Sequence, residues 1–569
     1  MTFTEWLLFF LLVQLVHFAG TWKLYQKAGR KAWEAAIPVY NVIVLLGIIK
    51  RPKWWTILLF FPIVNLLMFP ILWIESARSF GFYQRKDTAL VVLTLGLYLF
   101  YINYATDAKY RADRSLDPRT PLGEWVSSIA FAIIAATMVH TYFMQPYTIP
   151  TSSLEKTLLV GDYLFVSKFH YGARIPMTTI AAPMLHDSLP TAILTGKNTK
   201  SYLRSPQLPY MRMPGLQKIK RNDIVVFSWP TDTLVHWTNP GKGIDHKPID
   251  KRSNYVKRCV GIPGDSLSLV DGYVYINGKL NELPDRAKLQ FFYTYTTKGN
   301  ISENNMPRFV RDKERSYVFS IPTKYWDDPT VQRRFIKDEV AATKLFGDSI
   351  RTEFKGNLSQ ELFNRLEINI VQNKRNINLT DEEAEKLRKQ SQTVSLEKII
   401  HDADPKVFPH TSNGWSQDNF GPMYIPEAGK TVSLNLESLP FYKEIITRYE
   451  YNNLDVIGEN IYINGKKATS YTFKQDYYWM MGDNRHNSLD ARYWGFVPYD
   501  HVLGKPVFIW FSWDADAPSL GAKIKSIRWD RMFTTVGGSG EPVSYLMYFV
   551  IALGLYIVYS FYRKRKKAK

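Results

Sequence analysis

At the end of an apolar stretch, the chain reads Ile149-Pro150-Thr151-Ser152-Ser153-Leu154. The apolar stretch is Trp125–Met144, and about 20 such residues are enough to cross the hydrocarbon layer of a bilayer as a helix. The sequence that follows contains β-branched and apolar runs, such as Asp223–Ser228 and Tyr255–Gly261. The junction therefore predicts a mainly β domain anchored by a transmembrane helix, with Ser153 close to the membrane surface.

Two polar motifs lie far downstream of Ser153. Lys257 lies in the run Tyr255–Gly261, and a group of charged residues begins at Gly482-Asp483-Asn484-Arg485. A serine nucleophile needs a group that takes its proton, and a lysine can do so when burial lowers its pKa towards neutrality. Serine–lysine pairs are a known variant of the catalytic triad. Together the motifs indicate a membrane-anchored peptidase. Taken singly, Ser153 could be a turn or N-cap serine, and Lys257 an exposed lysine at a strand edge.

The motifs resemble the sequence boxes of the type I signal peptidases. The run from Ile149 to Asp162 is similar to the nucleophile box of that family, and Asp223–Phe227 to its next strand box. The run Tyr255–Asp265 resembles the lysine box. The residues that resemble the last box of the family are Met481–Arg485, Asn487, Ser488, Asp490, Arg492, Trp494–Pro498 and Gly504-Lys505. All four boxes stand in the family's order.

This resemblance implies a signal-peptidase-like β fold with a substrate groove. It also implies a serine endopeptidase that removes signal peptides from exported preproteins after small residues. Ser153 would be the nucleophile and Lys257 the general base. Ser488 would orient the lysine nitrogen, and Thr151 would add its hydroxyl to the oxyanion hole. A supporting structural role is implied for Asp483, Arg485, Asp490 and Arg492, the last two as an ion pair.

The chain departs from the family pattern at two places. Leu154-Glu155-Lys156 follows Ser153 where the family has Met-x-Pro, and His486 stands where the family has an acidic residue. Lys156 places a second lysine near the nucleophile, although Lys257 lies in the matching box and is the expected base. Leu154-Glu155-Lys156 in place of the expected run is the best support for the alternative of a non-catalytic membrane scaffold or partner-binding protein that retains the signal-peptidase fold. A self-cleaving serine–lysine protein is a further alternative, against which the flanking apolar spans argue.

Composition narrows the classes of partner. The chain has 569 residues, a net charge of +20 and one cysteine, Cys259, which excludes an intrachain disulfide. Much of the positive charge lies beside apolar stretches, including the tail Arg563–Lys567, so membrane topology explains it better than nucleic acid does. No cofactor or metal is expected, because the sequence lacks phosphate-binding glycine patterns and clusters with metal-ligand spacing.

Six apolar stretches organise the chain: Trp6–Ala19, Ala36–Ile49, Ile57–Ile74, Ala89–Tyr104, Trp125–Met144 and Val543–Tyr562. The second contains Pro38 and is expected to be re-entrant or interfacial. Basic clusters at 23–31, 50–53 and 109–119 and the basic tail then share the cytoplasmic side, and residues 145–541 lie outside. Arg78, Arg85 and Lys86 are exceptions on an expected outer loop. We therefore expect a multi-pass protein of the cell membrane, with signal peptides, membrane lipid and the secretion machinery as partners.

The expected divisions are a multi-span region (1–123), a helix leading into the catalytic domain (124–144), a first catalytic part (145–280), an insertion of unknown role (281–455), a second catalytic part (456–533), a C-terminal transmembrane helix (543–562) and a basic cytoplasmic tail (563–569). The insertion is expected to mix α and β structure. It should contain a helix after Thr380, where Glu383 completes a capping box. Asn277-Gly278 and Asn464-Gly465 each predict a β-hairpin.

Overall fold

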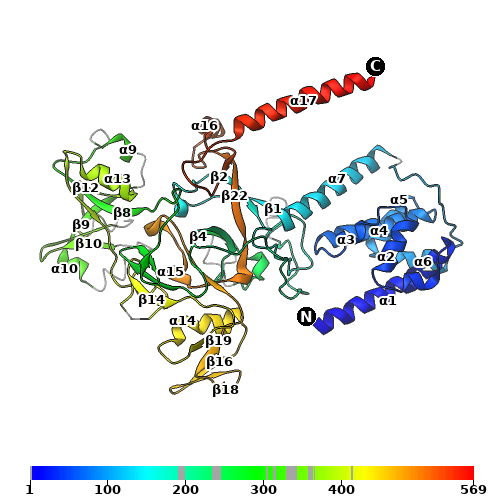
Figure 1. The fold of residues 1–569 in the computed structure, drawn as a ribbon, viewed down its shortest axis with the longest axis horizontal. Helices are drawn as coiled ribbons and strands as arrows, with labels where there is room; N and C mark the ends of the chain where they lie inside the picture. The colour runs from blue at the N-terminus through cyan, green and yellow to red at the C-terminus, as the bar shows by residue number, and fades with distance from the viewer. Residues whose placement is uncertain are drawn as a thin grey trace.

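The computed structural model describes residues 3–118, 120–189, 199–232, 245–302, 306–311, 315–328, 343–355, 363, 366–411 and 414–568. A group of helices at the N-terminal end, a β-rich body and a separate C-terminal helix follow one another along the chain (Figure 1). Strands dominate the body, which agrees with the predicted mainly β domain.

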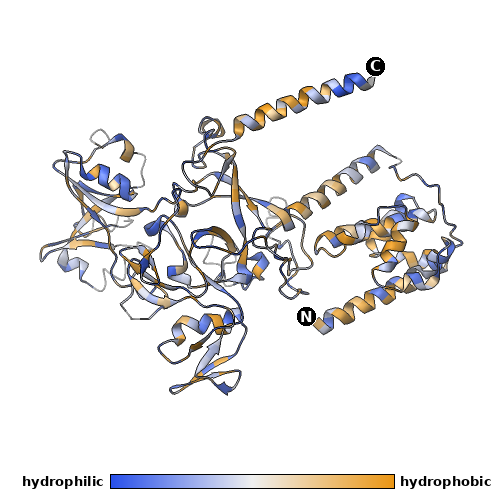
Figure 2. Cartoon of the chain, viewed as in Figure 1, coloured by the Kyte–Doolittle hydropathy of each residue, from blue (hydrophilic) through white to orange (hydrophobic). Residues whose placement is uncertain are grey.

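Three helices in the described part are long and apolar enough to cross a membrane: α1 (Phe3–Lys27), α7 (Pro121–Met138, continued by η2, Val139–Phe143) and α17 (Leu546–Ala568). Apolar residues cover most of their length, and α17 ends in a hydrophilic tail (Figure 2). Thr120 is the N-cap of helix α7, and its side chain accepts a hydrogen bond from the Gly123 N–H at 3.1 Å. Pro121 is the first residue of the helix, a position that favours proline. These helices contain the first predicted stretch and most of the fifth and sixth.

The other apolar stretches form shorter helices: η1 (Ala32–Ala35), α2 (Tyr40–Ile48), α3 (Trp55–Leu58), α4 (Val64–Ser79), α5 (Arg85–Leu93) and α6 (Tyr98–Tyr104). Helix α2 has only nine residues, too few to span a bilayer. Helices α5 and α6 meet at 117°, as in a broken span or a re-entrant loop. The third stretch is divided between α3 and α4.

Two sets of contacts mark the two ends of the membrane region. At one end, the Trp6 indole donates to Gln207 O at 2.9 Å, and the Tyr142 hydroxyl donates to Pro62 O at 3.0 Å, beside the β-rich body. At the other end, Glu75 forms ion pairs with three arginines: Arg51 (3.0 Å), Arg78 (3.4 Å) and Arg114 (2.7 Å). The structure thus corrects the position expected for Arg78, which lies with the basic residues that precede α7.

The central element of the body is an eight-stranded antiparallel sheet that contains β1 (Met144–Thr148), β2 (Asp162–Ser167), β22 (Val502–Ser512), β3 (Ile224–Ser228), β4 (Asn254–Gly261), β20 (Tyr477–Met481) and β21 (Val497–Pro498) in this order, with β23 (Thr534–Thr535) paired to β22. Strand β4 lies between β3 and β20, with Lys257 opposite Val225 and Arg258 opposite Met481. The β1–β2 connection, far from β20 in the strand order, nevertheless contacts the loop after β20, so the sheet curls into a half-barrel.

Both Asn-Gly hairpins predicted from the sequence are present. One joins β6 (Tyr273–Ile276) to β7 (Lys279–Leu280), and the other joins β17 (Asn460–Ile463) to β18 (Lys466–Lys467). In each turn the asparagine and the glycine have positive φ, 52° and 79° in the first and 51° and 78° in the second. These values explain the Asn-Gly sequence, because other residues rarely adopt this conformation.

The stretch 281–455 contributes to two different parts of the structure. Its first part forms a six-stranded sheet: β10 (Thr343–Gly347), β11 (Arg351–Lys355), β9 (Arg315–Pro322), β12 (Asn369–Leu379), β8 (Phe291–Thr297) and β13 (Thr393–Lys398). Helix α13 (Asp381–Arg388) packs on this sheet and has the predicted capping box of Thr380 and Glu383. Short helices α9 (Arg308–Arg311) and α10 (Thr323–Trp326) lie in the same part.

The second part of this stretch completes the core of the body. Strand β14 (Phe420–Tyr424) pairs with β5 (Ser266–Val270), which also pairs with β6. Helices α14 (Leu439–Glu444) and η5 (Ile445–Tyr449) bury Ile446 in the same cluster as Trp479 of β20. The remaining elements are η3 (Ser152–Leu154), η4 (Ile249–Lys251), β15 (Thr431–Ser433), β16 (Leu454–Ile457), β19 (Ser470–Thr472), η6 (Arg485–Asn487), α15 (Ala491–Trp494), η7 (Tyr499–His501) and α16 (Leu520–Lys525).

Candidate active site

The structure brings Ser153 and Lys257 together. Ser153 lies in the single turn η3, between β1 and β2, and Lys257 lies on the interior strand β4. Lys257 Nζ is 2.5 Å from Ser153 Oγ, which is hydrogen-bond distance. Both side chains are buried, with relative exposures of 3% for Lys257 and 6% for Ser153. A lysine in this position can exchange a proton directly with the serine hydroxyl.

Burial sets the protonation state of Lys257. Burial disfavours the ammonium form and lowers the pKa of Lys257 to about 8. The Asp490 carboxylate favours the ammonium form and opposes part of this shift. Both nearby carboxylates are themselves paired with arginines, Asp490 with Arg492 and Asp483 with Arg258. Because these pairs neutralise the carboxylates, they favour the lysine cation less than free carboxylates would. A substantial neutral fraction of Lys257 is therefore present near pH 8.

Asp483 and Arg485 support the loop after β20 through different partners. Asp483 binds Arg258 through two hydrogen bonds, and the Thr157 hydroxyl donates to its Oδ2 at 2.8 Å. Although burial alone would raise the pKa of the Asp483 carboxyl, the Arg258 guanidinium holds it below its usual value. Arg485 instead donates to backbone carbonyls, those of Gly272 at 3.1 Å and Gly482. Both residues are fully buried and hold the backbone of the loop.

Asp490 and Arg492 form a buried bidentate ion pair, with Nε–Oδ1 and Nη2–Oδ2 distances of 2.8 Å each. Asp490 Oδ2 also accepts the Gly482 N–H at 3.1 Å. Arg492 Nη2 donates to Arg485 O at 2.5 Å, so the pair ties the two ends of the loop together. This arrangement is a rigid frame beside Lys257.

Ser488 and Thr151 lie near the pair but make no hydrogen bond to Lys257 in the described residues. Ser488 Oγ is buried and has no hydrogen-bond partner there, although a Cβ atom at Gly482 would lie 2.3 Å from it and 2.5 Å from Ser153 O. Thr151 is exposed and precedes the η3 turn as its N-cap, without a side-chain capping bond. Thr151 is thus close to the nucleophile in the chain, and Ser488 is close to it in space.

The second lysine of the nucleophile loop has a different partner. Lys156, three residues after Ser153, forms an ion pair with Glu383 of helix α13. Leu154 of the same departure is fully buried, with Leu158 and Leu164, in an apolar cluster behind the loop. The unusual Leu154-Glu155-Lys156 run therefore packs the loop on the body and connects it to α13.

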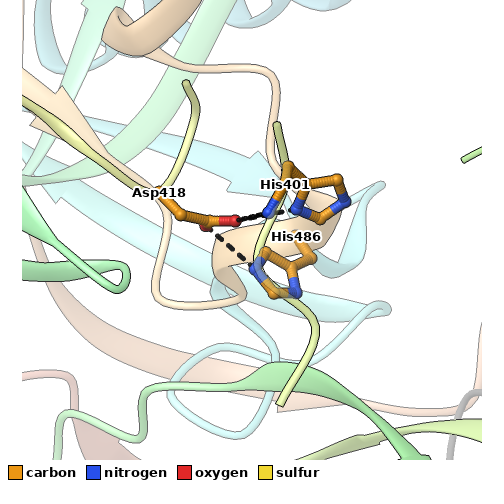
Figure 3. A group of neighbouring side chains, drawn as sticks. All are labelled: His401, Asp418 and His486. Carbon is orange, nitrogen blue, oxygen red and sulfur yellow. Dashed lines mark hydrogen bonds and ion pairs between the residues drawn. The ribbon is translucent and has the colours of Figure 1, made fainter. Parts of the chain in front are cut away.

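His486, the other departure, belongs to a cluster that sequence spacing did not reveal. His401, Asp418 and His486 gather their ligand atoms within 4.8 Å of one another (Figure 3). His486 Nδ1 accepts the Phe292 N–H at 3.0 Å, and its Nε2 is 3.0 Å from Asp418 Oδ1. Because Nδ1 accepts, Nε2 must carry the proton and donate to the carboxylate, which leaves no lone pair for a metal. The cluster is therefore a hydrogen-bonded support rather than a built metal centre.

The charge states in this cluster follow from burial and pairing. Burial lowers the pKa of His486 to about 4, so the ring is neutral at pH 7. Although burial would raise it, hydrogen bonds from His401 and His486 hold the pKa of Asp418 well below its usual range. Asp418 comes from the second part of the stretch 281–455. Asp418, which is distant in sequence, thus places a carboxylate next to position 486, where the family has an acidic residue.

Sequence reasoning missed two further residues at this site, Asn484 and Gln290. The Asn484 N–H donates to Ser153 O at 3.1 Å, and its Nδ2 donates to Ser152 O at 3.2 Å. Gln290 Nε2 donates to Glu155 O at 2.6 Å, and its backbone bonds to both Asp483 O and Arg485 N at 2.9 Å. Asn484 lies inside the quoted motif, but its role needs the fold. No local signal marks Gln290.

Comparisons with known proteins relate the chain to a peptidase family. Residues 122–325 and 435–513 match the family described as "Signal peptidase, peptidase S26", and residues 33–113 match a family of unknown function. Relatives named signal peptidase I include that of Buchnera aphidicola subsp. Acyrthosiphon pisum, 22% identical over 67% of this chain and 72% of the relative. That of Helicobacter pylori is 21% identical over 73% of this chain and 91% of the relative. That of Rickettsia felis is 30% identical over 28% of this chain and 45% of the relative.

Proposed function

Because the chain belongs to the signal peptidase family S26, as a type I signal peptidase, we propose that Ser153 and Lys257 are the residues with which it cleaves signal peptides. The enzyme is a serine endopeptidase, and its substrates are preproteins that carry a signal peptide. The observation that carries the assignment is the 2.5 Å contact between Lys257 Nζ and Ser153 Oγ in a buried site.

In the proposed reaction, neutral Lys257 takes the proton of Ser153 as Oγ attacks the scissile carbonyl. The ammonium then gives this proton to the leaving amine, and the acyl group stays on Ser153. A water molecule, deprotonated by the neutral lysine, releases the signal peptide and restores both residues. A pKa of about 8 suits a group that must both accept and donate a proton near neutral pH.

Two hydroxyls have supporting roles in this proposal. Thr151 is exposed beside the nucleophile, so its hydroxyl is available to the oxyanion together with the Ser153 N–H. Among the described residues, the buried Ser488 Oγ has no hydrogen-bond partner, and it orients Lys257 when the lysine is charged. Leaving a buried hydroxyl unpaired costs about 1–3 kcal/mol, which favours a role that is filled during the reaction. An extended substrate would lie along the curled sheet, with small side chains before the cut.

We also propose a multi-pass membrane orientation with the body outside the cytoplasm. The basic residues around Glu75, those preceding α7 and the tail after α17 would then share the cytoplasmic side, as the positive-inside rule requires. The N-terminus of α1 would lie outside, since Trp6 contacts Gln207 of the body. Membrane lipid around the three long helices and the secretion machinery are the proposed partners. Within the stretch 281–455, the six-stranded sheet is proposed as an addition to the catalytic domain formed by 145–280 and 456–533, and the part with β14 and α14 as a component of its core.

Cleavage in trans tests the assignment. Purified full-length protein in detergent should cut a preprotein at its signal peptide, and Ser153→Ala should abolish the cut while leaving the protein folded. Ser152→Ala is the matched control, since it removes the neighbouring hydroxyl, which accepts from Asn487 Nδ2 at 2.8 Å. A folded wild-type protein that fails to cut any preprotein would support the scaffold alternative. Cleavage by Ser153→Ala at the normal rate would exclude Ser153 as nucleophile.

A further inference from the structure

Asn378, a buried residue of strand β12, reaches the nucleophile loop from outside the regions that match the family. The matched regions are 122–325 and 435–513, so β12 lies between them. Asn378 has a relative exposure of 3%, and its Nδ2 donates to Asn484 Oδ1 at 2.7 Å. Asn378 Oδ1 has no hydrogen-bond partner in the described residues. The bond to Asn484 is therefore the polar contact that fixes this side chain.

The direction of the bonds in this chain of amides is determined by a backbone carbonyl. Ser152 O can only accept, so the atom of Asn484 that faces it must be Nδ2. Asn484 Oδ1 then faces Asn378, which must present its own Nδ2. The Asn484 N–H meanwhile donates to Ser153 O. Asn378 is thus linked, through one residue, to the two carbonyls that belong to Ser152 and to the nucleophile.

The neighbouring strand makes the connection stiff. Phe292 of β8 lies opposite Asn378, and Gln290, just before β8, bridges Asp483 O and Arg485 N through its backbone. The Gln290 side chain also binds Glu155 O, on the other side of Ser153. The six-stranded sheet therefore contacts both the nucleophile loop and the loop after β20.

We propose that Asn378 is a positioning residue for the cleavage reaction, through which the six-stranded sheet fixes Ser153 relative to Lys257. This inference rests on the proposed serine–lysine pair. Catalysis is sensitive to such positioning, since a shift of about 1 Å can cost about 100-fold in rate. Asn378 does not touch the reacting atoms, so its removal should lower kcat more than it changes KM.

The test compares Asn378→Asp with Asn376→Asp in the purified full-length protein. Both asparagines are buried on the same face of β12, two residues apart, but Asn376 Oδ1 accepts from the Thr294 hydroxyl of β8 at 3.0 Å. Each change is isosteric and adds one buried carboxyl. Only the change at 378 places an acceptor against Asn484 Oδ1. The two oxygens then repel each other, or the Asn484 side chain turns away from Ser152.

We expect kcat on a peptide substrate to fall about 10- to 100-fold in Asn378→Asp, with KM changed less than about threefold. Asn376→Asp should keep kcat within about threefold of the wild type. Thermal unfolding should show similar losses of stability in both variants. As the pH falls, protonation of the carboxyl at 378 restores a donor, so the deficit in kcat relative to the wild type should shrink. A purely structural effect would not produce this pH dependence.

Equal kcat values for the two variants, whether both normal or both low, would overturn the proposal. Ser153→Ala in the same assay separates the two claims. If it is inactive while Asn378→Asp is normal, the positioning role fails and the catalytic assignment stands. If Ser153→Ala still cleaves, the catalytic assignment itself fails. Should Asn378→Asp not fold, Asn378→Ala and Asn376→Ala provide the same comparison of kcat.

Discussion

The guanidinium of Arg258 binds the carboxylate of Asp483 through two hydrogen bonds, Nε–Oδ1 at 2.7 Å and Nη2–Oδ2 at 2.6 Å. Arg258 follows Lys257 on β4, and Asp483 follows β20, so the pair joins the strand of the lysine to the adjacent loop. Asp483 also raises the pKa of Lys257, against the larger effect of burial. The pair therefore influences both the geometry and the proton affinity of the site.

Replacing Arg258 should shift the pH dependence of cleavage. In the wild type, kcat/KM should rise with pH around a midpoint of about 8, since only neutral Lys257 accepts the proton. In Arg258→Met the buried Asp483 carboxylate is unpaired and favours the lysine cation, so the midpoint should move to higher pH. Stability should also fall by about 3–5 kcal/mol. Peptide cleavage measured from pH 6 to 10 checks this expectation.

Arg221→Met is the matched control for that change. Arg221 also binds a carboxylate through two hydrogen bonds, that of Asp265, but neither residue is among the groups that shift the pKa of Lys257. Its midpoint should remain that of the wild type. An unchanged midpoint in folded Arg258→Met would contradict the electrostatic coupling.

Lys156 should be dispensable for chemistry. Lys156→Ala removes a partly exposed ion pair with Glu383, and pairs of this kind contribute about 0–1 kcal/mol. We expect cleavage to remain within about fivefold of the wild type. Lys257→Arg should be inactive, because arginine stays protonated. Steady-state peptide cleavage distinguishes the two lysines, and the reverse result would make Lys156 the base.

Gly482 should be intolerant of a side chain. A Cβ at this position would lie 2.3 Å from Ser488 Oγ and 2.5 Å from Ser153 O, so Gly482→Ala must displace the nucleophile loop. We expect at least about 100-fold lower kcat, from misplacement of Ser153. Gly299→Ala is the control, since a Cβ there meets no atom within 4 Å. Normal activity in Gly482→Ala would show that the loop adjusts without cost.

The sequence predicted the strands and turns of the site well because their signals are local. The Asn-Gly hairpins, the capping box at Thr380 and the β-branched run around Lys257 each depend on neighbouring residues. The pairing of Ser153 with Lys257 came from a resemblance, since no local pattern brings residues 104 positions apart together.

Other features depend on contacts that no local pattern encodes. Asp418 reaches His486 across 68 positions, and Asn378 reaches Asn484 across 106. For the same reason the stretch 281–455 looked like one insertion. Pairing of β14 with β5, far apart in the sequence, makes its second part belong to the core. Arg78 was expected apart from Arg51 and Arg114 because the stretch Ile57–Ile74 looked like one span, whereas all three arginines pair with Glu75.

Thiol labelling should test the orientation. In a Cys259→Ser background, a cysteine at exposed Glu437 should react with a membrane-impermeant reagent in intact spheroplasts, because the proposed orientation places the body outside. A cysteine at exposed Lys86 should be protected until the membrane is opened. Arg111 N donates to Ser79 O at 2.9 Å, so this segment lies with the residues that precede α7. Labelling at Lys86 alone would invert the proposed topology, and labelling at both would return this segment to the outer side.

Two replacements should separate the outer strands of the six-stranded sheet from the core. From the sequence, replacing Pro284–Asn452 by a short Gly/Ser linker would be expected to leave a folded, active domain. In the structure that change removes Ile425 and Ile446, both fully buried beside Trp479, together with Gln290 and Asn378. We therefore expect the wide replacement to aggregate or to fold without cleaving peptides.

Replacing only Arg315–Leu366 removes a separate apolar cluster, that of Ile321, Trp326 and Phe354, and keeps β8 and the end of β12. This narrow variant loses β9, a neighbour of β12, but leaves β12 paired with β8, so it should fold and keep peptide cleavage within about tenfold. Size-exclusion profiles and peptide cleavage of both variants check the expectation. Activity in the wide variant would show that neither Gln290 nor Asn378 is needed to hold Ser153.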